Sequence, residues 1–153
     1  MFRLCFRYSH NYEDAQEILQ NGFLKVFLNL SKVDYRGEKQ FENWLKTIFI
    51  NESINFIKQR KLEFVSIDDI KINAIDNNDD FDSSLTDEIY YQFLMDLPVG
   101  YRTIFNLYAI EGYSHKEIAD KLSISESTSR SQLTKARKLL QKNINETNGI
   151  ENR

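Results

Sequence analysis

The stretch SHKEIADKLSISESTSRSQLTKARKLL, residues 114–140, carries the clearest structural signal in this chain. Ser114 and Glu117 form an S-x-x-E capping pattern, and apolar residues follow it at helical spacing. Ser125 is suited to cap a second helix, because its hydroxyl can accept a hydrogen bond from a backbone N–H of the first turn. The stretch therefore predicts two short helices joined by a turn at residues 123–125.

The second of these helices combines an apolar face with a basic, hydroxyl-rich face. The residues expected outward or along the flanks are Ser127, Thr128, Ser129, Arg130, Ser131, Thr134, Lys135, Arg137 and Lys138. The pattern is that of a helix-turn-helix, whose second helix meets base edges in DNA. Arg130 is long enough to contact guanine O6 and N7, whereas Glu126 fits the helix start but would repel a phosphate. A helical hairpin with a solvated basic face remains an alternative from this pattern alone.

Charge is distributed unevenly along the chain, whose net charge is −3. Residues 1–62 carry ten Lys or Arg against seven acids, and residues 97–153 carry nine against six. Residues 63–96 hold ten acids and one base. The acidity is therefore confined to the middle of the chain, and two mildly basic units flank it.

The fold prediction is all-α, with two small helical domains at residues 1–62 and 89–145. The Asp-rich and Asn-rich segment at residues 63–88 predicts a flexible acidic linker that self-repulsion extends. Residues 146–153 are expected to form a disordered tail. Ahead of the helix-turn-helix, we expect helices at residues 89–95 and 103–110, with a turn at LPVGYR between them and Gly112 at the end of the second.

Composition and motifs argue against several other classes of protein. No apolar run approaches the roughly 18 residues of a membrane span, and MFRLCFRYSH lacks the features of a signal peptide. One cysteine, Cys5, cannot form an internal disulfide, which favours a cytoplasmic location. His10 and His115 have no evident partner cluster, and no metal-ligand spacing, phosphate loop or nucleophile motif appears. We therefore expect no catalytic residue, no metal, no cofactor and no enzymatic activity.

Residues 11–30 show the pattern of a long helix that Asn11 can cap. The apolar positions expected to form one broad buried stripe are Ala15, Ile18, Leu19, Phe23, Val26, Phe27 and Leu30. Gly22 lies on that stripe and would let a neighbouring helix approach closely. The outer face is expected to carry Glu17, Gln20, Asn21 and Lys25.

A polar loop, SKVDYRGEKQ, precedes a second helix that we expect to continue to about Lys61. By their spacing, the aromatic residues Phe23, Phe27, Phe41 and Trp44 are predicted to pack in a core. The exposed side of the second helix is expected to carry Asn43, Lys46, Asn51, Asn55, Lys58, Arg60 and Lys61. Cations and amides beside an aromatic-bearing loop suit single-stranded nucleic acid. The basic cluster at residues 58–61 fits equally well the stabilisation of a helix C-terminus.

Three stretches together carry a family resemblance. They are NYEDAQEILQNGFLKVF, YRGEKQFENWLKTIFINESINFIKQRK and LPVGYRTIFNLYAIEGYSHKEIADKLSISESTSRSQLTKARKLL. In this order they resemble the extracytoplasmic-function (ECF) type of bacterial sigma factor, the subunit that gives RNA polymerase its promoter specificity. GYSHKEIADKLSIS…TSRSQLTKAR is especially similar to versions from Bacteroides-type bacteria. The family usually carries more chain before the position of Met1, so we expect either a truncated start or an unusually small first domain.

The resemblance implies a role for each unit and a set of partners, namely core RNA polymerase, promoter DNA and, as for many members, an anti-sigma factor. The first domain would be sigma region 2, and its polymerase-binding residues would be Asp14, Glu17, Gln20 and Asn21. Its readers of the melted −10 element would be Tyr35, Arg36, Lys39, Asn43, Lys46, Asn51, Asn55 and Lys58. The second domain would be sigma region 4, and its readers of the duplex −35 element would be Ser127, Thr128, Arg130, Ser131, Lys135 and Arg137.

Three other functions compete with this interpretation. A response-regulator-type transcription factor could use the same helix-turn-helix without being a polymerase subunit, but it would leave residues 11–61 without a purpose. An adaptor or anti-sigma protein would not need the basic face at residues 130–138. An enzyme would need a cluster of catalytic residues that the sequence does not offer.

Overall fold

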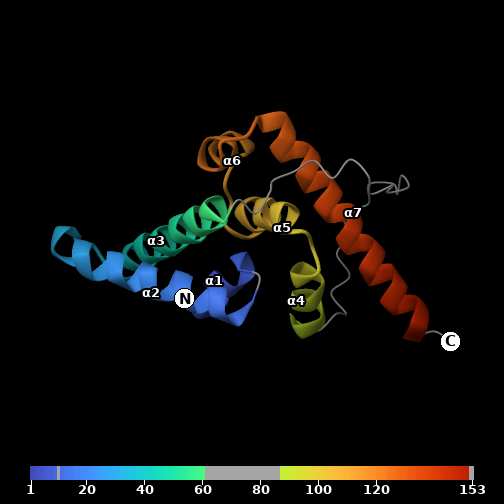
Figure 1. Cartoon of the computed structure of the whole chain (residues 1–153), viewed down its shortest axis with the longest axis horizontal. Helices are drawn as coiled ribbons and strands as arrows, with labels where there is room; N and C mark the ends of the chain where they lie inside the picture. The colour runs from blue at the N-terminus through green and yellow to red at the C-terminus, as the bar shows by residue number, and fades with distance from the viewer. Residues whose placement is uncertain (10, 61–86, 152–153) are drawn as a thin grey trace. The chain divides into compact units, whose positions relative to one another are not determined.

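The computed structural model describes residues 1–9, 11–60 and 87–151, and these ranges are helical without a strand, which confirms the all-α prediction. They form two compact units, Met1–Leu62 and Glu63–Arg153. The first unit contains α1 (Phe2–Tyr8), α2 (Tyr12–Asn29), the short 3-10 helix η1 (Leu30–Lys32) and α3 (Glu38–Gln59). The second contains α4 (Asp87–Met95), α5 (Val99–Phe105), the π-helical turn η2 (Asn106–Ile110), α6 (His115–Leu122) and α7 (Glu126–Glu151) (Figure 1).

Two predicted segments need separate comment. Residues 63–86 of the predicted acidic linker lie outside the described residues, and α4 begins directly after them. The tail predicted to be disordered from residue 146 is instead helical as far as Glu151, because α7 continues through it. None of the helices described is both long and apolar enough to cross a membrane.

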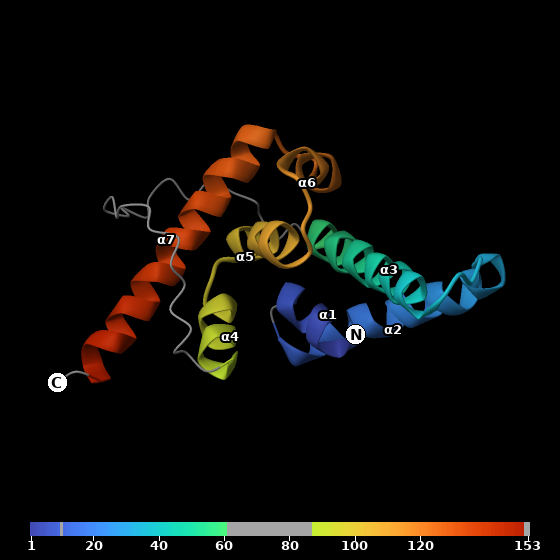
Figure 2. The same ribbon diagram turned by 180° about the vertical axis from the view of Figure 1, so that it is seen from behind.

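In the first unit, α2 and α3 run antiparallel and α1 packs against both (Figures 1 and 2). Asn11 caps α2 as predicted, since its Oδ1 accepts a hydrogen bond of 2.8 Å from the N–H of Asp14. The two helices approach closely at Gly22, where an added Cβ atom would overlap the ring of Phe49. The absence of a side chain at Gly22 therefore decides how closely α3 can pack on α2.

Ion pairs join α2 to α3 on both sides of this contact. Arg60 Nη1 lies 2.8 Å from Asp14 Oδ1, and the guanidinium also lies over the ring of Phe56. Lys25 pairs with Glu52, whose side chain is nearly buried. A carboxylate that is buried needs such a partner, because removing its charge from water is otherwise costly.

The second unit is built around α7, against which α4, α5 and α6 pack. Its core includes the side chains of Ile104, Leu107, Ile118, Ala136 and Leu140, each with no exposed surface. Gly112 has a φ of 78°, the left-handed conformation that was predicted for the end of the preceding helix.

The turn predicted at LPVGYR is shorter than expected, since α5 already begins at Val99. Gly100, within the predicted turn, is buried in α5 although glycine is a poor helix former, so packing has overridden its local preference. Arg102 is also buried and donates a hydrogen bond of 2.7 Å to the carbonyl oxygen of Met95, which ties α5 to the end of α4.

Candidate nucleic-acid interface

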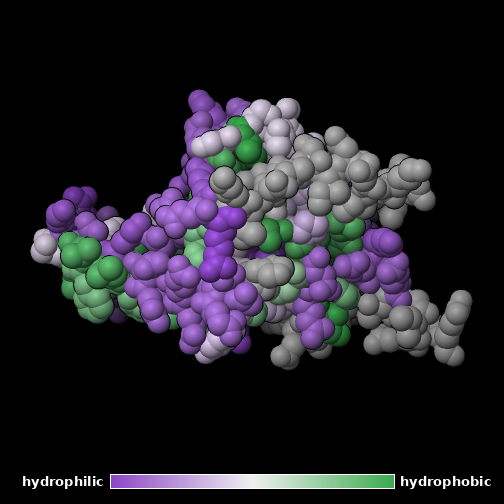
Figure 3. All heavy atoms as spheres, in the orientation of Figure 1, coloured by the Kyte–Doolittle hydropathy of each residue, from purple (hydrophilic) through white to green (hydrophobic). Residues whose placement is uncertain are grey.

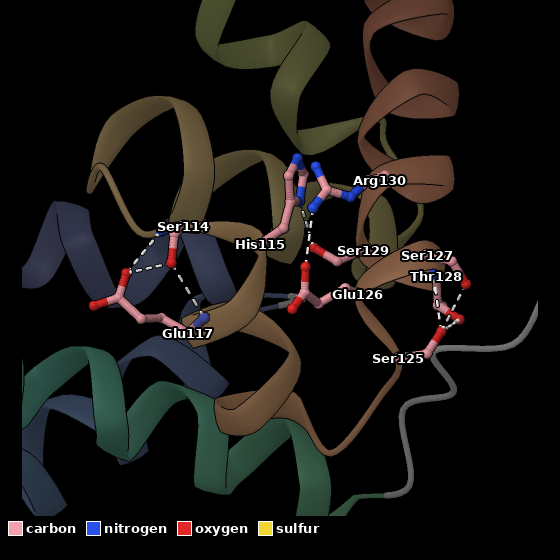
Figure 4. Close-up of polar contacts among 9 residues, drawn as sticks. All are labelled: Ser114, His115, Glu117, Ser125, Glu126, Ser127, Thr128, Ser129 and Arg130. Atoms are coloured by element: carbon pink, nitrogen blue, oxygen red, sulfur yellow. Dashed lines mark hydrogen bonds and ion pairs between the residues drawn. The ribbon is translucent and has the colours of Figure 1, made fainter.

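The start of α6 has the capping box that the sequence predicted (Figure 4). Glu117 N–H donates to Ser114 Oγ at 3.3 Å, and Ser114 N–H donates to Glu117 Oε2 at 2.8 Å. The hydrogen bonds that the backbone N–H and the hydroxyl of Ser114 donate to the Glu117 carboxylate lower the pKa of Glu117, because they favour its charged form. The capping box fixes the entry of the chain into α6, the first helix of the helix-turn-helix.

Ser125 caps α7 with its hydroxyl oxygen. Thr128 N–H donates to Ser125 Oγ at 3.0 Å, and this oxygen also lies 3.0 Å from Ser127 Oγ and 2.8 Å from Thr128 Oγ1. Between the two helices, Ser123 adopts the left-handed conformation, with a φ of 58°. The turn predicted at residues 123–125 is therefore confirmed.

The predicted DNA-reading residues of α7 share one exposed side of the helix. Ser127, Arg130, Ser131 and Arg137 are exposed, whereas Thr128 and Lys135 are half-buried. Positions 127, 130, 131, 134 and 137 follow the three- and four-residue spacing of one helical face. A face of this kind, beginning at the helix N-terminus, is suited to the major groove.

Arg130 forms an ion pair with Glu126, the acidic residue that would repel a DNA phosphate. Its Nη2 lies 2.9 Å from Oε2 of Glu126, one turn earlier on α7. The side chains remain 62% and 45% exposed, so this pair contributes at most about 1 kcal/mol and can be exchanged for another partner. Glu126 thus directs Arg130 without burying it.

Ser129 is not on the outer face, contrary to the prediction. It has no exposed surface, and its Oγ lies 2.9 Å from Nδ1 of His115 in a hydrogen bond that either atom can donate. The reason is the packing of α7 on α6, which buries the side of α7 next to Arg130. Local spacing could not reveal this partner of His115, because Ser129 is 14 residues away in the chain. The other histidine, His10, lies outside the described residues.

A second polar surface follows α3. The predicted single-strand readers Lys39, Asn43, Asn51, Asn55 and Lys58 are exposed and lie along one side of the helix at spacings near four residues. Lys46 is half-buried at the flank and pairs with Glu42 at 2.8 Å. This stripe offers amides and cations along most of the length of α3.

An aromatic cluster lies beside the first turns of this stripe. The rings of Phe41 and Trp44 stack with centroids 5.5 Å apart, and Tyr35 meets Phe41 edge-on at 6.1 Å. Phe41 and Trp44 are half-buried rather than in a core, and Tyr35 is 63% exposed. Arg36, the neighbouring cation, is held by Asp34 at 2.6 Å.

The outer face of α2 differs from the prediction at Asp14. This residue is buried and bound to Arg60, so it belongs to the contact between α2 and α3. Glu17, Gln20 and Asn21 are exposed as predicted. The prediction was wrong for Asp14 because its partner, Arg60, lies at the far end of α3 and is not apparent from local spacing.

The predicted buried stripe of α2 is also wrong at its C-terminal half. Apolar side chains that are 42–72% exposed form a patch, which we call the apolar tip: Phe23, Leu24, Phe27, Leu28 and Leu30. Figure 3 shows hydrophobic residues gathered over this end of α2 and η1. The sequence held a signal for this surface, since apolar residues between Ala15 and Leu30 occupy more of the helix circumference than one neighbouring helix can cover.

Comparison with known proteins accounts for both units. Residues 1–63 match the family described as Sigma-70 region 2, and residues 87–140 match Sigma-70, region 4. The chain is 30% identical over 151 residues to the RNA polymerase sigma-H factor of Pseudomonas aeruginosa, covering 91% of this chain and 77% of that protein. It is 30% identical over 147 residues to the ECF RNA polymerase sigma factor SigE of Mycolicibacterium smegmatis, covering 92% and 55%.

A solved structure shares the fold. It is the sigma factor RpoE in complex with the anti-sigma factor NepR from Bartonella quintana, with a TM-score of 0.58 and 20% sequence identity. The similarity covers 94% of this chain and 89% of that one.

A helix-turn-helix unit preceded by a second helical unit with its own polar stripe defines a class of DNA-reading transcription proteins. Within it, the chain belongs to the sigma-70 family of RNA polymerase sigma factors and is of the ECF type. It is a sigma factor that directs transcription initiation from promoters. A response-regulator-type factor does not account for the match over residues 1–63.

Proposed function

We propose that this sigma factor divides its work among three surfaces. The exposed face of α2 docks on core RNA polymerase, the stripe of α3 with its aromatic cluster holds the melted −10 strand, and the exposed face of α7 reads the −35 duplex. The proposal is carried by one observation: most of the side chains of each surface are exposed, and each surface follows one face of a helix, with Tyr35 and Arg36 added from the loop before α3.

The polymerase-docking surface combines polar and apolar residues on one face. Positions 17, 20, 21, 24, 27 and 28 follow helical spacing, so Glu17, Gln20 and Asn21 continue directly into the apolar tip. Large exposed apolar patches on a protein mark interaction sites, since leaving them in water is unfavourable. We therefore extend the polymerase-binding set to Leu24, Phe27 and Leu28, and we remove Asp14 from it.

The single-strand surface has the two components that such binding needs. Lys39, Asn43 and Lys58 supply donors along α3 that can follow a phosphate backbone, and the exposed ring of Tyr35 supplies a stacking surface. Arg36 pairs with Asp34, and Lys46 pairs with Glu42, both on the surface. Exposed ion pairs contribute little free energy, so either cation can leave its carboxylate for a phosphate.

The remaining parts of the proposal concern the setting of the protein. The complex of the similar RpoE with NepR supports an anti-sigma partner for this chain as well. We also propose that the chain is of a Bacteroides-like type, from the resemblance of residues 112–137. We further propose that the protein acts in the cytoplasm, where its polymerase is, and that it has no catalytic activity of its own.

The experiment is in vitro transcription with matched core polymerase on a promoter library. Arg130→Ala should weaken recognition of the −35 element by about 1–3 kcal/mol, the contribution of one bidentate base contact. The matched control is Lys142→Ala, an exposed cation on the same helix, which should leave promoter choice unchanged. Failure of the wild-type chain to bind core polymerase, or equal loss by Arg130→Ala on promoters with and without the −35 element, would contradict the proposal.

A further inference from the structure

Three elements of the second unit meet at the side chain of His115. Its imidazole stacks on the ring of Tyr108 in η2, with centroids 4.5 Å apart and planes inclined by 22°. On α7, Ser129 forms the hydrogen bond of 2.9 Å to His115 Nδ1 (Figure 4). The imidazole thus connects the start of α6 with the π-helical turn and with the first turn of the DNA-reading helix.

The position of Ser129 makes this connection important for α7. Ser129 is buried, whereas the next residue, Arg130, is exposed. Successive residues of a helix are rotated by about 100°, so holding Ser129 against α6 fixes the direction in which Arg130 leaves the helix. A rotation of about 10° would move a guanidinium lying about 8 Å from the axis by about 1.4 Å, enough to spoil a hydrogen bond to a base.

The charges around His115 favour its neutral form. Burial lowers the pKa of the imidazole, the positive charges of Arg130 and Arg137 act in the same direction, and Glu126 opposes them. The Cζ atom of Arg137 lies 5.9 Å from the centroid of the Tyr108 ring, on which His115 stacks. A neutral imidazole can hold Ser129 without adding a further positive charge that would push Arg130 away.

We propose that His115 is a positioning residue for promoter reading: its hydrogen bond to Ser129 sets the rotation of α7 and hence the direction of Arg130. The proposal rests on the function proposed above for α7. His115 should therefore affect which −35 sequence is preferred, and not the overall affinity for DNA. A side chain that only stabilised the unit would alter transcription from all promoters equally.

The test uses holoenzyme reconstituted from the full chain and core polymerase, on promoters whose −35 element is randomised, with the transcripts sequenced. His115→Ala and Ser129→Ala should each reduce the preference for the base that Arg130 reads by about five- to tenfold, part of the discrimination of one bidentate contact. The double variant should lose no more base preference than the more affected single variant, since both substitutions remove the same hydrogen bond. His115→Asn, whose amide can replace Nδ1 as a hydrogen-bonding group, should keep the preference within about twofold.

Controls separate positioning from folding. Ser129→Ala removes only a hydroxyl and so carries the test even if His115→Ala unfolds, which thermal unfolding would reveal. Lys116→Ala changes an exposed residue beside His115 and should leave base preference unchanged. Equal loss on every library member, additive effects in the double variant, or His115→Asn behaving as His115→Ala would overturn the role of His115. Wild-type holoenzyme without any −35 preference would instead overturn the function proposed for α7, and this inference with it.

Discussion

Removing exposed apolar side chains from α2 should weaken polymerase binding while leaving the fold intact. Phe27 and Leu28 are 72% and 67% exposed in the apolar tip. Complete burial of such a side chain contributes about 1.5–3 kcal/mol, so the part still exposed corresponds to about 1–2 kcal/mol for each residue. Since association does not convert all buried area into affinity, we expect Phe27→Ala/Leu28→Ala to bind core polymerase about 10- to 100-fold more weakly.

The matched control lies on the opposite face of the same helix. Val26 is buried, so Val26→Ala should lower the free energy of unfolding by about 1–3 kcal/mol while the folded protein keeps its affinity for polymerase. The double variant of the tip should lose only about 1 kcal/mol of stability, because little of either side chain is buried in the free chain. Titration of labelled chain with core polymerase measures the affinity, and thermal unfolding measures the stability.

Two results would refute this reasoning. If Phe27→Ala/Leu28→Ala bound core polymerase as tightly as the wild type, the apolar tip would not be a polymerase contact. If the double variant were destabilised as strongly as Val26→Ala, the two side chains would be packed in the fold and not free for a partner. A fall in polymerase affinity for Val26→Ala alone would place the contact on the other face of α2.

Three further predictions concern packing and protonation. Gly22→Ala should destabilise the first unit by about 1–3 kcal/mol in a denaturant titration, because the new methyl group would overlap the ring of Phe49, and a neutral effect would mean that α3 can move away. Burial raises the pKa of Cys5 to about 11, so an alkylating reagent at pH 8 should modify this thiol only after unfolding, and rapid reaction with the native chain would contradict its burial. The pKa of His115 in the folded chain is below its ordinary value of 6.5, so the unfolded chain takes up the proton first as pH falls. The stability of the second unit should therefore decrease as pH falls through 6.5 toward the folded pKa, and His115→Asn should remove this part of the pH dependence, as melting curves at several pH values would show.

The helix starts and ends of this protein could be predicted from sequence, because they depend on neighbours in the chain. Asn11 and the pair Ser114–Glu117 satisfy backbone donors only three residues away. Gly112 ends a helix because its own backbone adopts a positive φ without a steric penalty. The exposed side of α7 could also be predicted, since helical spacing alone places Ser127, Arg130 and Ser131 on one face.

The sequence could not decide which apolar or charged side chains would be covered. Between Ala15 and Leu30, periodicity permits more than one buried face. The packing of α1 and α3 on α2, with Phe49 against Gly22, selects one of them and leaves the apolar tip exposed. Asp14 is buried at the contact with α3 and paired there with Arg60, at the far end of α3. Local spacing determines which side chains share a face of a helix; the contacts between distant segments determine which face is buried, and therefore which surface remains for polymerase and DNA.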